Sequence, residues 1–209
     1  MTVSLPDAGL NEARGPRART RKLMLETAVA LMQQGQTPSI SDVAQAAEVS
    51  RATAYRYFPT QAALVHAAVD AALGPILEWQ SESDDPETRV KELLRTSMPR
   101  IQEFEATFKA ALKLSLEQWA RRQAGTLGDE APFKRGHRLE MLQKAIAPLE
   151  GRLPPAEFQR LAQALSLVYG LELLVVLKDM WGLDFDGIQS VAEWAAAALV
   201  RASLEEARA

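Results

Sequence analysis

Side chains suited to DNA recognition lie close together in residues 39–58, SISDVAQAAEVSRATAYRYF. Arginine pairs with phosphates and with the edge of guanine, and hydroxyl groups donate hydrogen bonds to phosphate oxygens. A helix that carries such side chains on one face fits the major groove of duplex DNA. The residues expected on this face are Ser50, Arg51, Thr53, Arg56 and the hydroxyl groups of Tyr55 and Tyr57.

Two short helices are predicted to position these side chains. Ser39 can cap the first helix, and Asp42, three residues later, completes the pattern of a capping box. Ser50 can cap the second helix, which Pro59 stops. The apolar residues expected to face inward are Val43, Ala44 and Ala47 on the first helix and Ala54, Tyr55 and Phe58 on the second.

A longer helix must brace this pair, because helices so short bury too little surface to be stable alone. The apolar pattern of residues 17–34 predicts that helix, and Gly35 is the residue expected to end it. Its predicted buried stripe consists of Leu23, Ala28, Leu31 and Met32.

The run VSRATAYRYF, followed after Pro59-Thr60 by QAAL, resembles the helix-turn-helix of the TetR family of transcriptional regulators. The resemblance covers residues 17–65. Glu48 stands where the turn commonly has glycine, and Gln61 stands where a phosphate-contacting lysine is common. The resemblance implies that DNA is contacted by Arg17, Arg19, Arg21, Ser41, Ser50, Arg51, Ala52, Thr53, Tyr55, Arg56, Tyr57 and Gln61.

The charge distribution also points to the N-terminal end as the DNA-facing end. The net charge of −3 by itself argues against a nucleic-acid partner. However, the segment 14–22 holds five basic residues and no acidic one, whereas acidic residues exceed basic ones in the remainder. Residues 1–16 are expected to be a disordered arm whose basic end meets phosphates or the minor groove, with a solvated tail as the alternative.

The rest of the chain predicts an all-α protein, with a helical bundle after the three-helix DNA-binding domain. The predicted domains are the arm of residues 1–16, the helix-turn-helix domain of residues 17–62, and an effector-binding and dimerisation domain of residues 63–209. Gly74-Pro75 should bend or break the helix of residues 61–81. The further helices are expected at residues 87–104 with an interruption near Pro99, 106–123, 134–149, 155–180, and 186–206 with Asp186 as cap.

The last two predicted helices are apolar on nearly every side, which indicates burial all round. A buried hairpin within one chain and a four-helix interface between two chains both fit this pattern. TetR-family dimers form through such an interface, so the resemblance favours a homodimer. The residues expected in that interface are Leu161, Leu165, Val168, Val175, Ile188, Val191, Ala195, Ala196 and Leu199.

Bulky apolar side chains in the predicted bundle suggest a receptor for a small, largely apolar effector, as the resemblance also implies. Such residues at helical spacing are more often plain core, and that alternative stays open. Glu172 lies in an apolar helix and needs a partner if it is buried, either Arg138 or the amine of a ligand. The predicted effector residues are Trp79, Met98, Phe104, Phe108, Leu112, Trp119, Met141, Tyr169 and Glu172.

The sequence offers little for catalysis, so no enzyme activity, metal or cofactor is predicted. The chain has no cysteine and no P-loop, dinucleotide fingerprint or nucleophile elbow. His137 and Glu140 have a metal-binding spacing, but no second helix repeats it. No signal-peptide pattern or bilayer-length apolar run is present, so a cytoplasmic protein without a membrane partner is expected.

The sequence features predict a DNA-binding protein, and the resemblance to the TetR family implies a repressor that binds a palindromic operator as a homodimer and is released by an effector. A helical ligand-binding or adaptor protein without effector-gated DNA release is the alternative. That alternative explains the bundle, but it leaves the basic segment and the SRATAYRYF face without a role.

Overall fold

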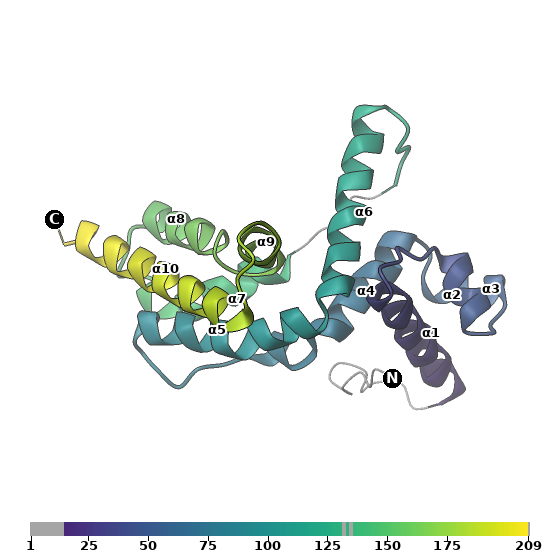
Figure 1. Cartoon of the computed structure of the whole chain (residues 1–209), viewed down its shortest axis with the longest axis horizontal. Helices are drawn as coiled ribbons and strands as arrows, with labels where there is room; N and C mark the ends of the chain where they lie inside the picture. The colour runs from purple at the N-terminus through teal and green to yellow at the C-terminus, as the bar shows by residue number, and fades with distance from the viewer. Residues whose placement is uncertain (1–14, 131–132, 134–135, 209) are drawn as a thin grey trace. The chain divides into compact units, whose positions relative to one another are not determined.

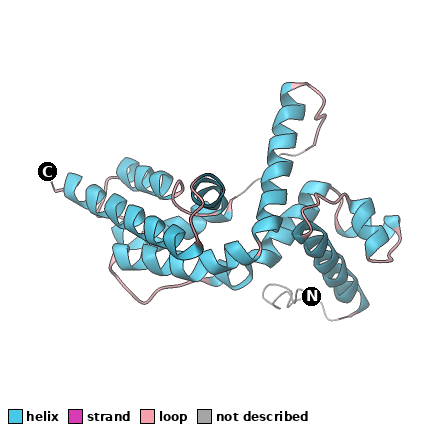
Figure 2. Cartoon of the chain, in the orientation of Figure 1, coloured by secondary structure: helices cyan, strands magenta, loops and turns pink. Residues whose placement is uncertain are grey.

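The computed structural model describes residues 15–130, 133 and 136–208, and these residues form helices, turns and loops without a β-strand (Figure 2). The all-α prediction is therefore confirmed. Of the predicted arm, residues 1–14 lie outside the described residues, and Pro16 already begins the first helix. No single described helix has the length and apolarity needed to cross a membrane; only the bent pair Arg51–Tyr57 and Gln61–Glu78, at 66° to each other, meets that test.

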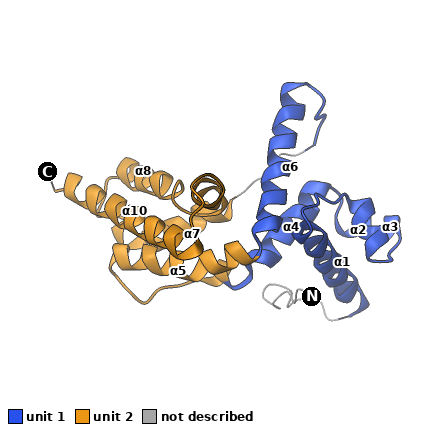
Figure 3. Ribbon diagram, viewed as in Figure 1, with its two compact units in different colours: residues 1–75, 104–134 blue, residues 76–103, 135–209 orange. Residues whose placement is uncertain are grey.

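Two compact units make up the chain (Figure 3). The first contains residues 1–75 and 104–134, and the second contains residues 76–103 and 135–209. The first unit thus takes up a helix from the middle of the chain beside the N-terminal helices. The predicted domain boundary after residue 62 stays a prediction.

The first unit is built on a long N-terminal helix that packs against three others (Figure 1). This helix, α1, contacts α2, α4 and α6. The helices of the unit are α1 (Pro16–Gln33), α2 (Ile40–Ala46), α3 (Arg51–Tyr57), α4 (Gln61–Leu73) and α6 (Glu105–Gln123). Two apolar clusters hold them together: one of α1, α2 and α3 with Leu64 of α4, and one of α1, α4 and α6.

The buried stripe of α1 differs from the predicted one. Leu23 is 45% exposed, while its neighbours Met24 and Leu25 are buried. Ala28 and Met32 are buried as predicted, and Val29 joins them. Helical periodicity fixes the spacing of a stripe, but near a helix end one residue of rotation decides which leucine points inward.

The predicted break after α4 is confirmed. Gly74 has φ 50° and ψ −121°, a conformation that side-chain-bearing residues rarely adopt, and α4 ends at Leu73. A short 3₁₀-helix, η1 (Gly74–Glu78), follows it. The regular α-helix therefore stops close to the point where the first unit gives way to the second.

The second unit is a helical bundle in which α10 packs against α5 and α8, and α7 packs against the same two helices. Its elements are α5 (Pro86–Glu103), α7 (His137–Ala145), the 3₁₀-helix η2 (Ala147–Leu149), α8 (Pro155–Leu165), α9 (Leu171–Leu174), the π-helix η3 (Val175–Met180) and α10 (Phe185–Glu206).

Several details of this unit correct the sequence-based expectations. Helix α5 continues through Pro99 without an interruption. Leu139, predicted to face inward, is 52% exposed. Asp184 rather than Asp186 caps α10, since its carboxylate accepts the backbone N–H of Gly187 at 2.9 Å. The single helix expected at residues 155–180 is broken after Leu165, and Gly170 in the break has φ 97°.

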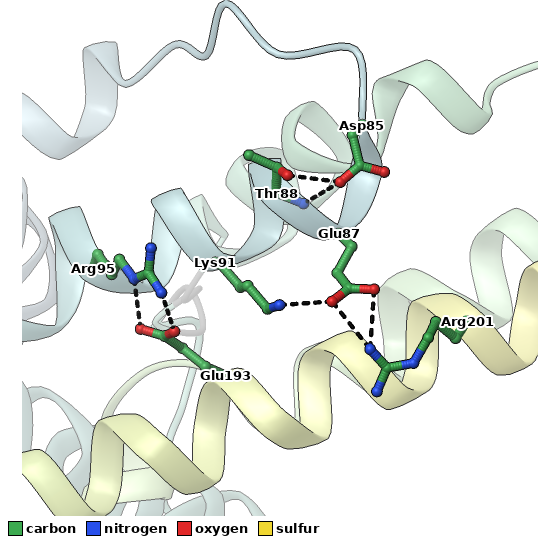
Figure 4. A network of polar contacts seen from close by, with 7 residues as sticks. All are labelled: Asp85, Glu87, Thr88, Lys91, Arg95, Glu193 and Arg201. Carbon is green, nitrogen blue, oxygen red and sulfur yellow. Dashed lines mark hydrogen bonds and ion pairs between the residues drawn. The ribbon is translucent and has the colours of Figure 1, made fainter.

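Ion pairs join α5 to α10 along one side of the second unit (Figure 4). Arg95 donates to both carboxylate oxygens of Glu193, at 2.9 and 2.6 Å. Glu87 accepts hydrogen bonds from Lys91 at 2.6 Å and from Arg201 at 3.0 Å. Because both carboxylates gain partners by folding, their ionised forms are favoured in the folded chain.

These contacts shift the acidity of the two carboxylates. The hydrogen bond from Arg95 lowers the pKa of Glu193 below its usual value, and the hydrogen bond from Lys91 does the same for Glu87. A lowered folded-state pKa contributes stability that is present above the unfolded pKa. That contribution is lost as the pH falls through the folded-state value.

The free energy of unfolding is therefore expected to fall as the pH drops below about 4, where these carboxylates take up protons. Urea unfolding between pH 7 and pH 3 measures this dependence. The variant Glu193→Gln cannot be protonated at that position, so its stability should fall less steeply over the same range. Parallel curves for the two proteins would contradict a contribution from the Arg95–Glu193 pair.

Candidate nucleic-acid interface

Helix α2 begins with the predicted capping box. The Ser39 hydroxyl accepts the backbone N–H of Asp42 at 3.2 Å, and the Asp42 carboxylate accepts the backbone N–H of Ser39 at 2.8 Å. The bond from the Ser39 backbone is the main reason that the pKa of Asp42 is lowered. The reciprocal bonds satisfy two N–H groups that the helix itself leaves unpaired, which fixes where α2 starts.

The turn between α2 and α3 contains the residue that departs from the TetR pattern. Glu48 has φ 54°, and no other non-glycine residue in the described ranges has a positive φ. A side chain in this conformation costs roughly 1 kcal/mol relative to glycine. The next residue, Val49, donates its N–H to the Ala44 carbonyl at 2.9 Å, so the turn is closed despite the strain.

Helix α3 is capped and oriented as predicted, with one exception. Ser50 accepts the backbone N–H of Thr53 at 3.2 Å, and its hydroxyl donates to the Thr53 hydroxyl at 2.9 Å. Ala54 and Phe58 are buried, but Tyr55 is 49% exposed instead of facing inward. Ala54 and Phe58 share a helix face because they are four residues apart, whereas the side chain of Tyr55, the next residue after Ala54, points in a different direction. Its ring therefore belongs to the outer surface of α3.

The outer surface of α3 combines positive charge with aromatic and hydroxyl groups. Arg51, Ala52, Tyr55 and Arg56 are exposed, and no acidic residue lies within α3. The guanidinium of Arg56 lies 5.6 Å from the centre of the Tyr57 ring. Tyr57 in turn packs against the apolar cluster of α1, α2 and α3, so it is only partly accessible.

Helix α1 contributes further basic side chains to the first unit. Arg17 and Arg19 are exposed. Arg21 is partly buried, with its guanidinium 5.5 Å from the centre of the Phe58 ring. Arg21 therefore packs over the C-terminal end of α3, whereas Arg17 and Arg19 keep their guanidinium groups in solvent. Ser41 on α2 is partly exposed.

Gln61 lies at the start of α4 with its amide turned toward the preceding loop. Its side-chain N–H groups donate to the Pro38 carbonyl at 3.0 Å and the Thr37 carbonyl at 3.4 Å. These bonds join α4 to the residues before α2. A phosphate contact by Gln61 stays a prediction, and it requires the side chain to exchange these partners for DNA.

The predicted effector residues are divided between the two units. Phe104, Phe108, Leu112 and Trp119 belong to the first unit and the other five to the second. Trp119 is 61% exposed, and Phe104 is part of the apolar core. In the second unit the Tyr169 hydroxyl lies 3.6 Å from the Met141 sulfur, and Glu172 pairs with Arg138, as predicted for its partner.

A narrow apolar crevice in the second unit was not predicted from the sequence. Of its lining residues, Tyr169 was predicted to contact an effector, whereas Leu165, Val168 and Ala196 were predicted to lie in a dimer interface. The side chains that line the crevice leave no room for a water molecule between them. The helical spacing of the α5 residues indicated burial but carried no sign of a crevice. Its walls include Val90, Leu94, Leu142, Leu165, Val168 and Tyr169.

The predicted dimer residues fall into two groups. Leu161, Leu165, Ile188 and Ala196 are buried within the chain itself and leave almost no surface for a partner. Val191 is 39% exposed, and the remaining four are partly exposed. Val191 and Trp194 have the i, i+3 spacing of one helix face, yet Trp194 was not predicted. It is one of several large apolar side chains of the second unit that are exposed to solvent and that were not predicted. These are Leu167, Val176, Met180, Trp181 and Trp194.

Comparisons with known proteins agree with this geometry. Residues 24–68 match the sequence profile of the family described as bacterial regulatory proteins, tetR family. This range contains α2, α3 and the turn between them, together with parts of α1 and α4. None of the curated proteins compared with the chain matches it.

Two solved structures resemble the fold over almost their whole length. A TetR transcriptional regulator from Rhodococcus sp. RHA1 has a TM-score of 0.56 and 17% identity, covering 89% of this chain and 97% of its own. A putative TetR-family transcriptional regulator from Mesorhizobium loti has a TM-score of 0.55 and 19% identity, covering 92% and 98%. At this identity the likeness extends to the fold alone.

Proposed function

We propose, from the premise that this chain belongs to the TetR family of transcriptional regulators, that it is a repressor which binds a palindromic operator as a homodimer and is released by a small effector. Proteins of this family are DNA-binding transcription factors and not enzymes. The observation that carries the proposal is the outer surface of α3, where Arg51, Tyr55 and Arg56 project from a helix capped at Ser50.

The contacts of α3 define how it would read DNA. Arg51 is the first residue of the helix and is exposed, so its guanidinium can reach O6 and N7 of a guanine together. The exposed Arg17 and Arg19 of α1 have the reach to meet phosphates, which would fix the orientation of the domain without selecting a sequence.

Two copies of α3 are needed because one short helix reads only a few base pairs. Paired recognition helices must lie about 34–36 Å apart to enter successive major grooves. The exposed side chains of Trp181 and Trp194, which are 73% and 70% accessible, support an apolar contact between two copies of the second unit.

Effector release requires the second unit to influence the first. The chain passes directly from α4, which begins just after the recognition helix, into the second unit through the break at Gly74. An effector that stabilises a different state of the second unit can thus shift the spacing of two recognition helices. It must prefer the released state, because equal affinity for both states shifts nothing.

Selection of bound duplexes from a random pool, followed by titration over a range of salt concentrations, tests the proposal. The expected result is an enriched sequence with two-fold symmetry, bound by two chains, with affinity that falls steeply as salt rises. Selection of no sequence, with binding that depends on salt alone, would reject an operator-binding repressor. A helical adaptor would bind neither the pool nor any selected duplex.

A further inference from the structure

The break between α8 and α9 is the most irregular segment of the second unit. Residues 161–177 are apolar on nearly every side and read as one continuous helix, yet residues 166–170 form turns. Gly170 has φ 97°, and a π-helix follows at Val175–Met180. Since π-helical turns are uncommon and are frequent at functional sites, the segment needs a physical cause.

A single arginine holds the break. Arg138, in the first turn of α7, donates to the backbone carbonyl of Ser166 at 3.2 Å and pairs with the carboxylate of Glu172. One guanidinium thus bridges the two sides of the break. The Arg138 and Glu172 side chains are 28% and 36% exposed, so solvent reaches this pair.

The guanidinium of Arg138 can lie against Gly170 because glycine has no side chain. A Cβ atom built at Gly170 would lie 2.7 Å from one terminal nitrogen of Arg138 and 3.0 Å from its central carbon. No side chain fits at that distance while Arg138 stays where it is. The glycine therefore allows both the turn and the close approach of the charge.

The same break forms one wall of the apolar crevice. Leu165 ends α8, and Val168 and Tyr169 lie in the turns, while the other lining residues come from α5, α7 and α10. Tyr169 is 2% exposed, and burial raises its pKa to about 12, although the charge of Arg138 acts in the opposite direction. The guanidinium of Arg138 lies against Gly170, the residue after Tyr169, and is therefore close to the crevice.

We infer that Arg138 is the docking point for the carboxylate of an amphipathic effector whose apolar body enters this crevice. That the ligand acts as an effector rests on the proposed function, whereas the binding site is argued from the geometry of the break alone. The carboxylate replaces Glu172 at the guanidinium. When Arg138 no longer bridges Ser166 and Glu172, residues 166–170 can move, and the crevice opens for the apolar body of the ligand.

The ligand is expected to have an anionic head group because the charged side chain beside the crevice is the cationic Arg138. Arg138 is the partner that contacts Ser166 and Gly170 in the break and that acts on Tyr169. A carboxylate can accept two parallel hydrogen bonds from a guanidinium, which gives both strength and orientation. Glu172 keeps access to water when it is displaced, because a third of its side chain is already exposed.

Calorimetric titration of the full chain with octanoate, octan-1-ol and octylamine tests the site without DNA. Octanoate is expected to bind at least about tenfold more tightly than octan-1-ol, since a charge-assisted bond is made only by the carboxylate. Lengthening the carboxylate from six to eight carbons should strengthen binding about fourfold per methylene. Stronger binding of octylamine than of octanoate would overturn the inference in favour of a site at Glu172.

Two variants separate a binding role for Arg138 from a structural one. With Arg138→Gln, octanoate and octan-1-ol should bind equally, because the preference for the charged head is lost. With Glu172→Gln, octanoate should bind more tightly than in the unaltered protein, because its competitor is gone. If Arg138 only stabilised the break, the Glu172→Gln variant should bind octanoate with weaker or unchanged affinity.

Arg95→Gln is the matched control, since Arg95 and Glu193 form an arginine–glutamate pair in the same unit that includes none of the residues bridged by Arg138. It should leave the octanoate preference unaltered. If Arg138→Gln does not fold by circular dichroism, the Glu172→Gln comparison still decides. Failure to bind octanoate leaves the operator proposal intact, whereas octanoate binding without any change in operator affinity rejects only the effector-release part.

Discussion

Trp194→Glu is expected to give monomers and to weaken operator binding at least about a thousandfold, with the helical content retained. Trp194 is 70% exposed on α10, so a charge there does not disturb the core of its own chain. In a homodimer built on this surface, the same carboxylate would be buried without a partner. Light scattering reports the molecular mass, and titration with the selected duplex reports the affinity.

Trp119→Glu provides a control matched in residue type and exposure. Trp119 is 61% exposed and belongs to the first unit, outside the proposed interface. That variant should remain dimeric. Dimers of Trp194→Glu would place the interface elsewhere. Glutamate at Ala196 is a poorer test, because that alanine is 1% exposed and the change would disturb folding.

Arg51→Ala is expected to cost about 1–3 kcal/mol of operator affinity per half-site and to relax the preference at one base pair. Arg51 is exposed at the start of α3, and α3 has no acidic residue that would compete for its guanidinium. Titration of the selected duplex, and of duplexes with each base pair of the half-site replaced, measures both effects.

Arg19→Ala is the companion variant. Arg19 is exposed on α1 and is expected to meet only phosphate, so its loss should weaken all duplexes alike. It should also flatten the salt dependence by about one counterion per half-site. If Arg51→Ala weakened operator and scrambled duplexes equally, Arg51 would be a phosphate contact and the base-reading role would be wrong.

The helix-turn-helix was predictable because local chemistry determines it. The capping box of Ser39 and Asp42, the cap at Ser50 and the positive φ at Glu48 involve residues at most three positions apart. Such interactions are fixed by residue type and spacing and need little from the rest of the fold. The break at Gly74 belongs to the same class, since glycine alone adopts its conformation readily.

Faces of helices were only partly predictable. Periodicity selected Ala28, Met32, Ala54 and Phe58 correctly, but it placed Leu23 and Tyr55 inside when both are exposed. The stripe is a property of the helix, whereas its rotation depends on the neighbours that cover it. The predicted interface and effector sets depended on the same rotation, and they stay predictions. They include Leu161, which is buried within its own chain, and do not include the exposed Trp194.

The sequence by itself determined an all-helical chain and a DNA-reading motif, because periods, caps and turns are local. Tertiary structure alone decided that α6 joins the N-terminal unit and that the helix expected at residues 155–180 breaks after Leu165. The residue that bridges this break, Arg138, lies 28 positions before Ser166 and 34 before Glu172. No pattern within one helix contains such contacts, because they arise only when distant segments pack together.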